Sequence, residues 1–327
     1  MFKIILTNFI SFFILCQPVI CFSQNKELLF VLNSMDNDIS AIDLNTKVVD
    51  FRIPTGKEPH HFYLTPDKKS LIVANAGGDS LTFIDPKTGS LQRTLRGIVD
   101  PYHLRFSPDM KWLVTLANRL DHVDIYKWEN NNPVLVKRIP TSKTPSHLWI
   151  DSKSTTAFAS MQDSNELIAI NLKTQSISWR INIGSIPADV FGTPDDKKLF
   201  VALTGDKKVL VFDIESSPAK LIKEIVTDSG AHAFRALGDG HHLFVSNRVA
   251  NNVTKINYKT LEIVETIPVP GGPDCMEISE DQQKLYVSSR WIGKLSVVDL
   301  KSRKVIDQIK VGKSPHGVWT LRHSSRH

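Results

Sequence analysis

Short hydrophobic runs and polar turns alternate along this chain with a regular spacing. The apolar run LFVLN begins at Leu29 and is followed by DISAIDL, in which polar and apolar residues alternate, and then by KVVDFRI and HFYLT. Gly, Pro, Asn and Asp separate the runs, as is typical of turns that join short β-strands. The spacing of an amphipathic helix does not occur along these runs. The pattern therefore predicts an all-β fold made of four-stranded units.

This unit occurs seven times, with a period of 42 to 44 residues. The copies start near residues 29, 71, 113, 156, 199, 243 and 285. Four strands at this period indicate a β-propeller, in which each twisted sheet is covered by its neighbours. The chain starts on the second strand of a unit and ends on a first strand, from His316 to Leu321. We expect one seven-bladed propeller of four-stranded antiparallel blades over residues 24–327, with the last strand completing the N-terminal blade.

The first 23 residues differ from the repeats. Lys3 precedes an apolar run, and the small residues Cys21 and Ser23 stand at the −3 and −1 positions of a cut after Ser23. This arrangement predicts a cleavable signal peptide over residues 1–23 and a periplasmic or secreted protein. The remaining chain has no apolar stretch of membrane-spanning length. Cleavage would leave Cys275 as the only cysteine, which excludes an intramolecular disulfide.

Charge is spread unevenly over the two faces of such a ring. The turns that join first to second strands and third to fourth strands share one face and are rich in lysine, for example in TPDKKS and DPKTGS. The net charge of +6 is modest, and few aromatic residues lie between these lysines. Because base stacking needs aromatic side chains, the pattern favours solvated turns over a nucleic-acid surface.

Histidines gather on the opposite face. We aligned the units on the proline that precedes each innermost strand, with Ala231 in its place in one unit. The first following position holds His60, Tyr102, Ser146, Ala188, His232, Asp274 and His316. The second holds His61, His103, His147, Asp189, Ala233, Cys275 and Gly317. Since innermost strands line the axial channel of a propeller, both sets should surround its mouth.

The second of these positions predicts a metal site, because imidazole, carboxylate and thiolate groups are the usual ligands of transition metals. The predicted ligands are His61, His103, His147, Asp189 and Cys275. The alternative is a structural role in which the rings cap turns or pack inside the channel. That alternative applies most directly to His60 and His316.

Arginines in the loops between second and third strands add a second kind of chemistry. Three of them have no turn-forming role, and one stands next to a tryptophan, so they suit an anionic or planar ligand. The predicted ligand-binding residues on this face are His60, His232, His316, Arg119, Arg248, Arg290 and Trp291.

The repeats resemble the YVTN β-propeller repeat family. The resemblance is found in LIVANAGGDSLTFIDPKTGS, LRFSPDMKW and LYVSSRWIGKLSVVDLKSRKVIDQIKVGKSPHGVW, and it extends over residues 29–321. It implies the propeller fold and relates the chain to propellers like the cytochrome d1 haem domain and nitrous oxide reductase. It implies little about activity, which depends on the site. Because the sequence has no CxxCH motif, the cofactors to consider are a transition metal and a noncovalent haem.

Three functions fit these features. The main prediction is an exported binding protein, a monomer whose partner is a metal or small molecule at the mouth of the axial channel. The first alternative is a lactonase-like hydrolase or lyase, in which a metal held by the histidines polarises a carbonyl and another imidazole acts as base. The second alternative is a non-catalytic scaffold for protein interactions. The sequence does not decide whether the protein is an enzyme.

Overall fold

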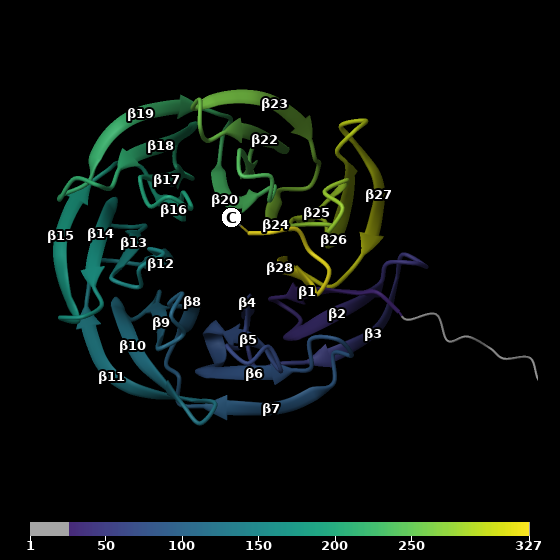
Figure 1. The fold of residues 1–327 in the computed structure, drawn as a ribbon. Helices are drawn as coiled ribbons and strands as arrows, with labels where there is room; N and C mark the ends of the chain where they lie inside the picture. Colours follow the sequence, from purple (N-terminus) through teal and green to yellow (C-terminus); the bar gives the residue numbers. More distant parts are fainter. Residues whose placement is uncertain (1–25, 327) are drawn as a thin grey trace, which may run out of the picture.

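The computed structural model describes residues 26–326, which form seven four-stranded antiparallel sheets arranged around a central axis (Figure 1). This confirms the predicted all-β, seven-bladed propeller. The predicted signal peptide, residues 1–23, lies outside the described residues. Within the described part of the chain, no helix has the length and hydrophobicity needed to cross a membrane.

Six blades place their strands in chain order from the axis to the rim, and the N-terminal blade has β28 innermost, followed by β1, β2 and β3 (Figure 1). The innermost strands are β4 (Pro59–Leu64), β8 (Pro101–Phe106), β12 (Pro145–Ile150), β16 (Pro187–Gly192), β20 (Ala231–Ala236), β24 (Pro273–Ile278) and β28 (Pro315–Thr320). The second strands are β1 (Leu28–Asn33), β5 (Leu71–Asn75), β9 (Trp112–Ala117), β13 (Thr156–Met161), β17 (Lys198–Leu203), β21 (His242–Asn247) and β25 (Lys284–Ser289).

The outer half of each blade follows the same order. The third strands are β2 (Asp38–Asp43), β6 (Ser80–Ile84), β10 (His122–Glu129), β14 (Glu166–Asn171), β18 (Lys208–Asp213), β22 (Asn252–Asn257) and β26 (Lys294–Asp299). The outermost strands are β3 (Val48–Pro54), β7 (Leu91–Arg96), β11 (Asn132–Pro140), β15 (Ser176–Asn182), β19 (Lys220–Val226), β23 (Glu262–Pro268) and β27 (Lys304–Lys310). A short 3₁₀ turn, η1 (Ala76–Gly78), joins β5 to β6.

The last strand closes the ring as predicted. β28 pairs antiparallel with β1, and Phe30 lies opposite Trp319 in this register. The hydroxyl of Thr320 also donates a hydrogen bond to the carbonyl of Leu28, at 3.0 Å. The N-terminal blade is thus completed by the C-terminal strand, which leaves no open sheet edge where the chain begins and ends.

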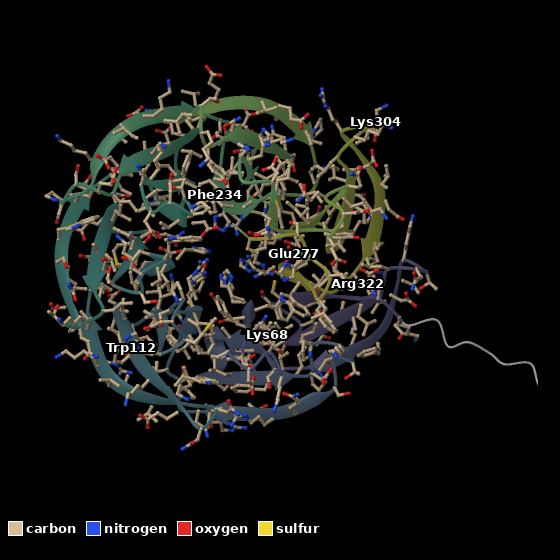
Figure 2. The ribbon with its side chains drawn as sticks, in the orientation of Figure 1. Lys68, Trp112, Phe234, Glu277, Lys304 and Arg322 are labelled. Atoms are coloured by element: carbon tan, nitrogen blue, oxygen red, sulfur yellow. The ribbon has the colours of Figure 1, made fainter. Side chains whose placement is uncertain are left out.

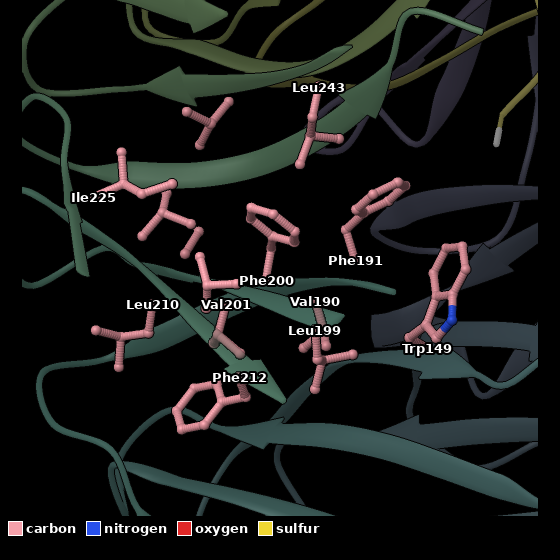
Figure 3. Packing of buried hydrophobic residues seen from close by; sticks show 14 of the residues in the cluster. Trp149, Val190, Phe191, Leu199, Phe200, Val201, Leu210, Phe212, Ile225 and Leu243 are labelled. Atoms are coloured by element: carbon pink, nitrogen blue, oxygen red, sulfur yellow. The ribbon is translucent and has the colours of Figure 1, made fainter. Parts of the chain in front are cut away.

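The hydrophobic core lies between adjacent blades. β1 and β5 are buried along their whole length, whereas most residues of the outermost strands β3 and β7 are exposed. Figure 3 shows one such cluster, in which Phe191 and Phe200 come from one blade and Leu243 from the next. A single blade could not bury these side chains on its own, which is why the fold needs the full ring.

Candidate functional site

A β-bulge follows the start of the innermost strands and determines what faces the axis. In β4 the register shifts between Pro59 and His61, and comparable shifts occur in the other six blades. In a regular strand two consecutive side chains point to opposite faces, whereas a bulge redirects one of them. The rings of His60 and His61 accordingly lie 4.8 Å apart, centroid to centroid. Both histidine positions predicted from the sequence therefore contribute to one cluster.

The first layer of this cluster is buried at one end of the axis. The ring centroids of His60 and His316 are 3.6 Å apart, and those of His60 and Tyr102 are 4.1 Å apart. His60, His232 and His316 are all buried. The predicted residues thus surround the axis as expected, and His60 and Tyr102 also line a surface pocket of about 500 Å³.

Asp274 is the anion at the centre of this layer, and its side chain is fully buried. Arg248 and Arg290 donate hydrogen bonds to its Oδ2 at 2.6 and 3.0 Å. The Nε2 atom of His232 lies 3.4 Å from its Oδ1, and that of His316 lies 3.7 Å from its Oδ2. Burial alone would raise the pKa of Asp274, but the charges of Arg248 and the neighbouring groups hold it well below its usual value. Both arginines predicted to bind a ligand are therefore ion-paired with this aspartate.

The second layer contains three further imidazoles. The ring of His61 lies 4.5 Å from that of His103 and 5.2 Å from that of His147, and the rings of His103 and His147 are 5.0 Å apart. Together with Asp189 and Cys275 they line an axial cavity of about 150 Å³. The structure thus brings all five predicted metal ligands to the same cavity. In Figure 2, side-chain nitrogen atoms gather around this axis.

All six axial histidines are neutral at pH 7. Burial is the main reason, because it disfavours the charged imidazolium, and neighbouring cationic groups add to the effect. The pKa of His147 is lowered to about 3. The pKa values of the other five, His60, His61, His103, His232 and His316, all lie well below the usual value.

In three of these imidazoles, Nδ1 lies within hydrogen-bond distance of a neighbouring oxygen atom, and Nε2 takes no part in that contact. Nδ1 of His316 donates to the carbonyl of His60 at 2.7 Å. Nδ1 of His147 lies 2.8 Å from the Ser146 hydroxyl, and Nδ1 of His232 lies 3.2 Å from that of Thr204. Metal-binding histidines in proteins show this arrangement, because the hydrogen bond fixes the tautomer and the ring orientation.

Two groups among the described residues bring three ligand atoms within 4.8 Å of one another. The first is His60, His61 and His316, and the second is His232, Asp274 and His316. His60 and His316 were assigned to ligand binding from the sequence, while His61 was assigned to metal binding. The residues predicted to bind a metal and those predicted to bind a ligand therefore meet at the axis.

Asp189 and Cys275 have more constrained surroundings than the imidazoles. Both carboxylate oxygens of Asp189 accept a backbone N–H at 2.8 Å, one from Val190 and one from Phe234 in the next blade. Burial raises the pKa of Asp189 to about 6. Burial also raises the pKa of the Cys275 thiol well above its usual value, and its Sγ lies 3.5 Å from Nδ1 of His316. Cys275 is therefore a protonated thiol, and Asp189 links two blades.

Of the two remaining predicted residues, Arg119 shares the surface pocket of His60 with Arg290, whereas Trp291 does not line that pocket. Arg119 bonds with Asp100 at 3.1 Å and with Glu58 at 2.8 Å, so it ties loops of neighbouring blades together. Trp291 is 58% exposed and lies over Gly272. It lines a surface groove that also contains Arg290.

The sequence analysis did not identify the side chains that lie two residues further along the innermost strands, deeper in the axial channel. Arg105, Trp149 and Arg235 stand two residues after the predicted second layer, and the alternation of a strand would have placed them on the same face. Arg235 is buried and forms an ion pair with Glu277, which also bonds with Arg326 from the C-terminal segment. Figure 2 shows Glu277 beside the axis.

Comparisons with solved structures show the same fold at low sequence identity. A periplasmic gluconolactonase from Pseudomonas aeruginosa, PpgL, is 17% identical with a TM-score of 0.76, over 92% of this chain and 99% of that one. The dihydro-haem d1 dehydrogenase NirN is 17% identical with a TM-score of 0.68, over 90% of this chain and 75% of that one. Hydrazine synthase from Kuenenia stuttgartiensis is 19% identical with a TM-score of 0.67, over 81% and 92% of the two chains.

A search of curated proteins finds no match to the chain. A family model, in contrast, matches nearly its whole length, from residue 7 to residue 326. This match agrees with the repeat pattern and with the seven-bladed ring, and it confirms the kind of propeller that the sequence resembles. The chain belongs to the YNCE-like β-propeller family.

Proposed function

We propose that the protein is an exported metal-binding propeller, which holds one transition-metal ion on neutral imidazoles at the axis. The observation behind the proposal is the triplet of His60, His61 and His316, whose ligand atoms lie within 4.8 Å of one another. A neutral imidazole offers a lone pair to a metal without first losing a proton. Imidazole ligands suit zinc, copper, iron and nickel.

Unpartnered nitrogens in the cluster support a bound ion. Nδ1 of His60, Nε2 of His61 and Nδ1 of His103 are buried without a hydrogen-bond partner among residues 26–326. Leaving a buried polar atom unpaired costs about 1–3 kcal/mol, so folded proteins rarely retain several in one place. Coordination to a metal would satisfy nitrogens of this cluster.

Electrostatics favours the all-histidine triplet over the one that includes Asp274. That carboxylate is already paired with Arg248 and Arg290, at 2.6 and 3.0 Å. A metal ion bound at that triplet would have to compete with two guanidinium groups for the carboxylate oxygens. His103 and His147 face the same cavity as His61 and could complete the coordination.

Export is part of the proposal because residues 1–23 have the pattern of a cleavable signal. The periplasmic gluconolactonase named above shows that this fold occurs in a periplasmic protein. A monomeric state is proposed as well, since the ring is closed by its own last strand. The intact mass of protein isolated from a periplasmic extract, and its elution volume in size exclusion, test both points.

The experiment for metal binding starts from chelator-treated protein. It is titrated with Zn²⁺, Cu²⁺ and Co²⁺ by calorimetry, and the metal content of untreated protein is measured by elemental analysis. We expect about one equivalent of a transition metal, with an affinity at least about tenfold weaker after His61→Ala or His60→Gln. His241→Ala is the matched control, because His241 is an exposed turn histidine.

Two results would contradict the proposal. The first is wild-type protein that binds none of the three metals near one equivalent. The second is unchanged affinity in folded His61→Ala and His60→Gln, judged by circular dichroism. In that case the imidazoles only pack the axis.

A further inference from the structure

Arg105 projects into the axial cavity from β8, deeper than the imidazole cluster. Its guanidinium carbon lies 4.4 Å from the centroid of the Trp149 ring, so the two planar groups are in cation–π contact. The same cavity is lined by His61, His103 and His147. Arg105 also lowers the pKa of each of these histidines. The guanidinium of Arg105 is therefore placed to contact a ligand in the cavity.

Among residues 26–326, this arginine has no acidic partner, unlike the other arginines around the axis. Arg248 and Arg290 are paired with Asp274, while Arg235 is paired with Glu277. In the described part of the chain, no hydrogen bond or ion pair involves the guanidinium of Arg105, and its Nε is buried without a partner. A partly buried cation without a counterion is unfavourable unless a ligand or solvent compensates it.

Asp189 is the acidic side chain that shares the cavity, but it does not supply this counterion. Its two oxygens accept backbone N–H groups of Val190 and Phe234, and it forms no ion pair with Arg105 within 4.0 Å. Arg326, which also lines the cavity, is bonded to Glu277. Within the part of the chain that the structure describes, the cavity thus contains one guanidinium fork that stacks on Trp149 and has no acidic partner.

We propose that Arg105 binds the carboxylate of a small organic acid inside the axial cavity. The planar fork of a guanidinium matches a carboxylate through two parallel hydrogen bonds. Stacking on Trp149 fixes the plane of that fork, which reduces the entropy lost on binding. The cavity volume of about 150 Å³ limits the ligand to a small molecule.

The walls of the cavity indicate the organic part of the ligand. Tyr63 and Phe234 line it with partly exposed rings, and Phe191 adds a third aromatic wall. Aromatic walls favour a flat or apolar body over a fully hydrated inorganic anion. A carboxylate with a ring or short chain therefore fits better than phosphate.

The test measures anion binding to the metal-free protein, so that its outcome is independent of the metal site. Chelator-treated full chain is titrated with benzoate, acetate and inorganic phosphate in a carboxylate-free buffer, by calorimetry and by thermal unfolding. We expect a saturable rise of Tm with benzoate, and a weaker effect of acetate and phosphate. Arg105→Gln should weaken benzoate binding at least about tenfold, because it removes a charge-assisted pair of hydrogen bonds.

Arg93→Gln is the matched control. Arg93 is also a partly buried arginine over an aromatic ring, with its guanidinium carbon 4.1 Å from the centroid of Phe83, but it lies on the outermost strand β7. Benzoate binding should be unchanged in this variant. Without ligand, Arg105→Gln should melt no lower than the wild type, since it removes an uncompensated charge. Arg105→Lys, which retains the charge without the fork, should also bind benzoate more weakly.

The proposal is wrong if the wild type shows no saturable response to benzoate, or if Arg105→Gln binds benzoate as the wild type does. Phosphate binding as strongly as benzoate would contradict the organic acid as ligand. A lower Tm of ligand-free Arg105→Gln than of ligand-free wild type would identify Arg105 as a structural residue.

Discussion

At the residue scale, the main finding is that the axial histidines are neutral because they are buried. His60 and His316 are in ring contact, and protonating either would place a charge against its neighbour in a medium that solvates it poorly. Their type and position follow from the sequence. Their protonation state does not, because it depends on burial by residues that are distant in the chain.

Acidification should therefore destabilise the protein through these histidines. The pKa of His147 is about 3 in the folded protein and about 6.5 in an unfolded chain. Between these values the unfolded chain binds the proton and the folded protein does not, so stability falls as pH decreases below 6.5. From pH 7 to pH 5, His147 alone should lower the free energy of unfolding by roughly 2 kcal/mol.

Urea unfolding of metal-free protein at the two pH values measures this effect. His147→Phe keeps a ring in place but cannot be protonated, so its loss of stability between pH 7 and pH 5 should be smaller than that of the wild type by this amount. His241→Gln, at an exposed turn position, should behave as the wild type. Equal pH dependence in wild type and His147→Phe would contradict the low pKa.

At the element scale, a recurring turn joins the innermost strand to the second strand. In four blades a Ser or Thr hydroxyl donates to an Asp two residues later, at 2.6 to 2.7 Å: Thr65 to Asp67, Ser107 to Asp109, Thr193 to Asp195, and Ser279 to Asp281. The TPD and SPD triplets made three of these turns predictable, while the turn at Ser279 reads SED. The β-bulges at the other end of the same strands were not, because a bulge depends on how two strands pair.

Removing one of these turn hydroxyls should reduce stability. Thr65 also accepts a hydrogen bond from the backbone N–H of Ser70 at 3.0 Å, so Thr65→Val should lower the free energy of unfolding by about 1–2 kcal/mol at pH 7. The hydrogen bond from Thr65 lowers the pKa of Asp67, so this contribution is present at neutral pH and is lost as Asp67 becomes protonated.

The variant and the wild type should therefore differ less at pH 3 than at pH 7, again in urea unfolding. Thr260→Val is the control. Thr260 is exposed, and it bonds to the side-chain oxygen of Asn257 through its backbone N–H rather than through its hydroxyl. A difference that is the same at both pH values would show that the Thr65–Asp67 bond does not depend on the charge of Asp67.

At the scale of the whole molecule, stability depends on closing the ring. β28 supplies the innermost strand of the N-terminal blade, and its Trp319 is buried against Phe30 of β1, with ring centroids 6.1 Å apart. Without it, β1 would expose an unpaired edge and an apolar face. The last strand thus completes the seventh contact between blades, in a ring in which each blade contacts only its neighbours.

Deleting residues 315–327 should abolish cooperative folding. The loss includes a buried Trp, whose truncation alone costs about 3–5 kcal/mol, and a whole strand, against a total stability of about 5–15 kcal/mol. Deleting residues 322–327 instead leaves β28 intact, and that chain should still show a cooperative transition in circular dichroism.

A circular permutant that places residues 315–321 and a short Gly/Ser linker before residue 26 provides the rescue. It makes the N-terminal blade continuous in sequence, and it should fold like the wild type. Cooperative unfolding of the 315–327 deletion at an unchanged Tm would contradict the closing role of β28.

The sequence by itself determined the architecture, because each blade is encoded locally. The period of apolar and polar runs gave the number of blades, and the phase of the repeat gave the closure by the strand from His316. Alignment on the prolines also identified the residues near the axis, such as His61 and His103, because every innermost strand occupies the same place in its blade.

Only the tertiary structure decided what these residues can do at the axis, because partners there come from blades that are far apart in the chain. His316 bonds with His60 across 256 positions, and Asp274 is paired with arginines of two loops. That no carboxylate of residues 26–326 pairs with Arg105 likewise follows only from how the seven innermost strands surround one cavity. Repeated local patterns specify a blade, whereas the chemistry of the axis arises from contacts between blades.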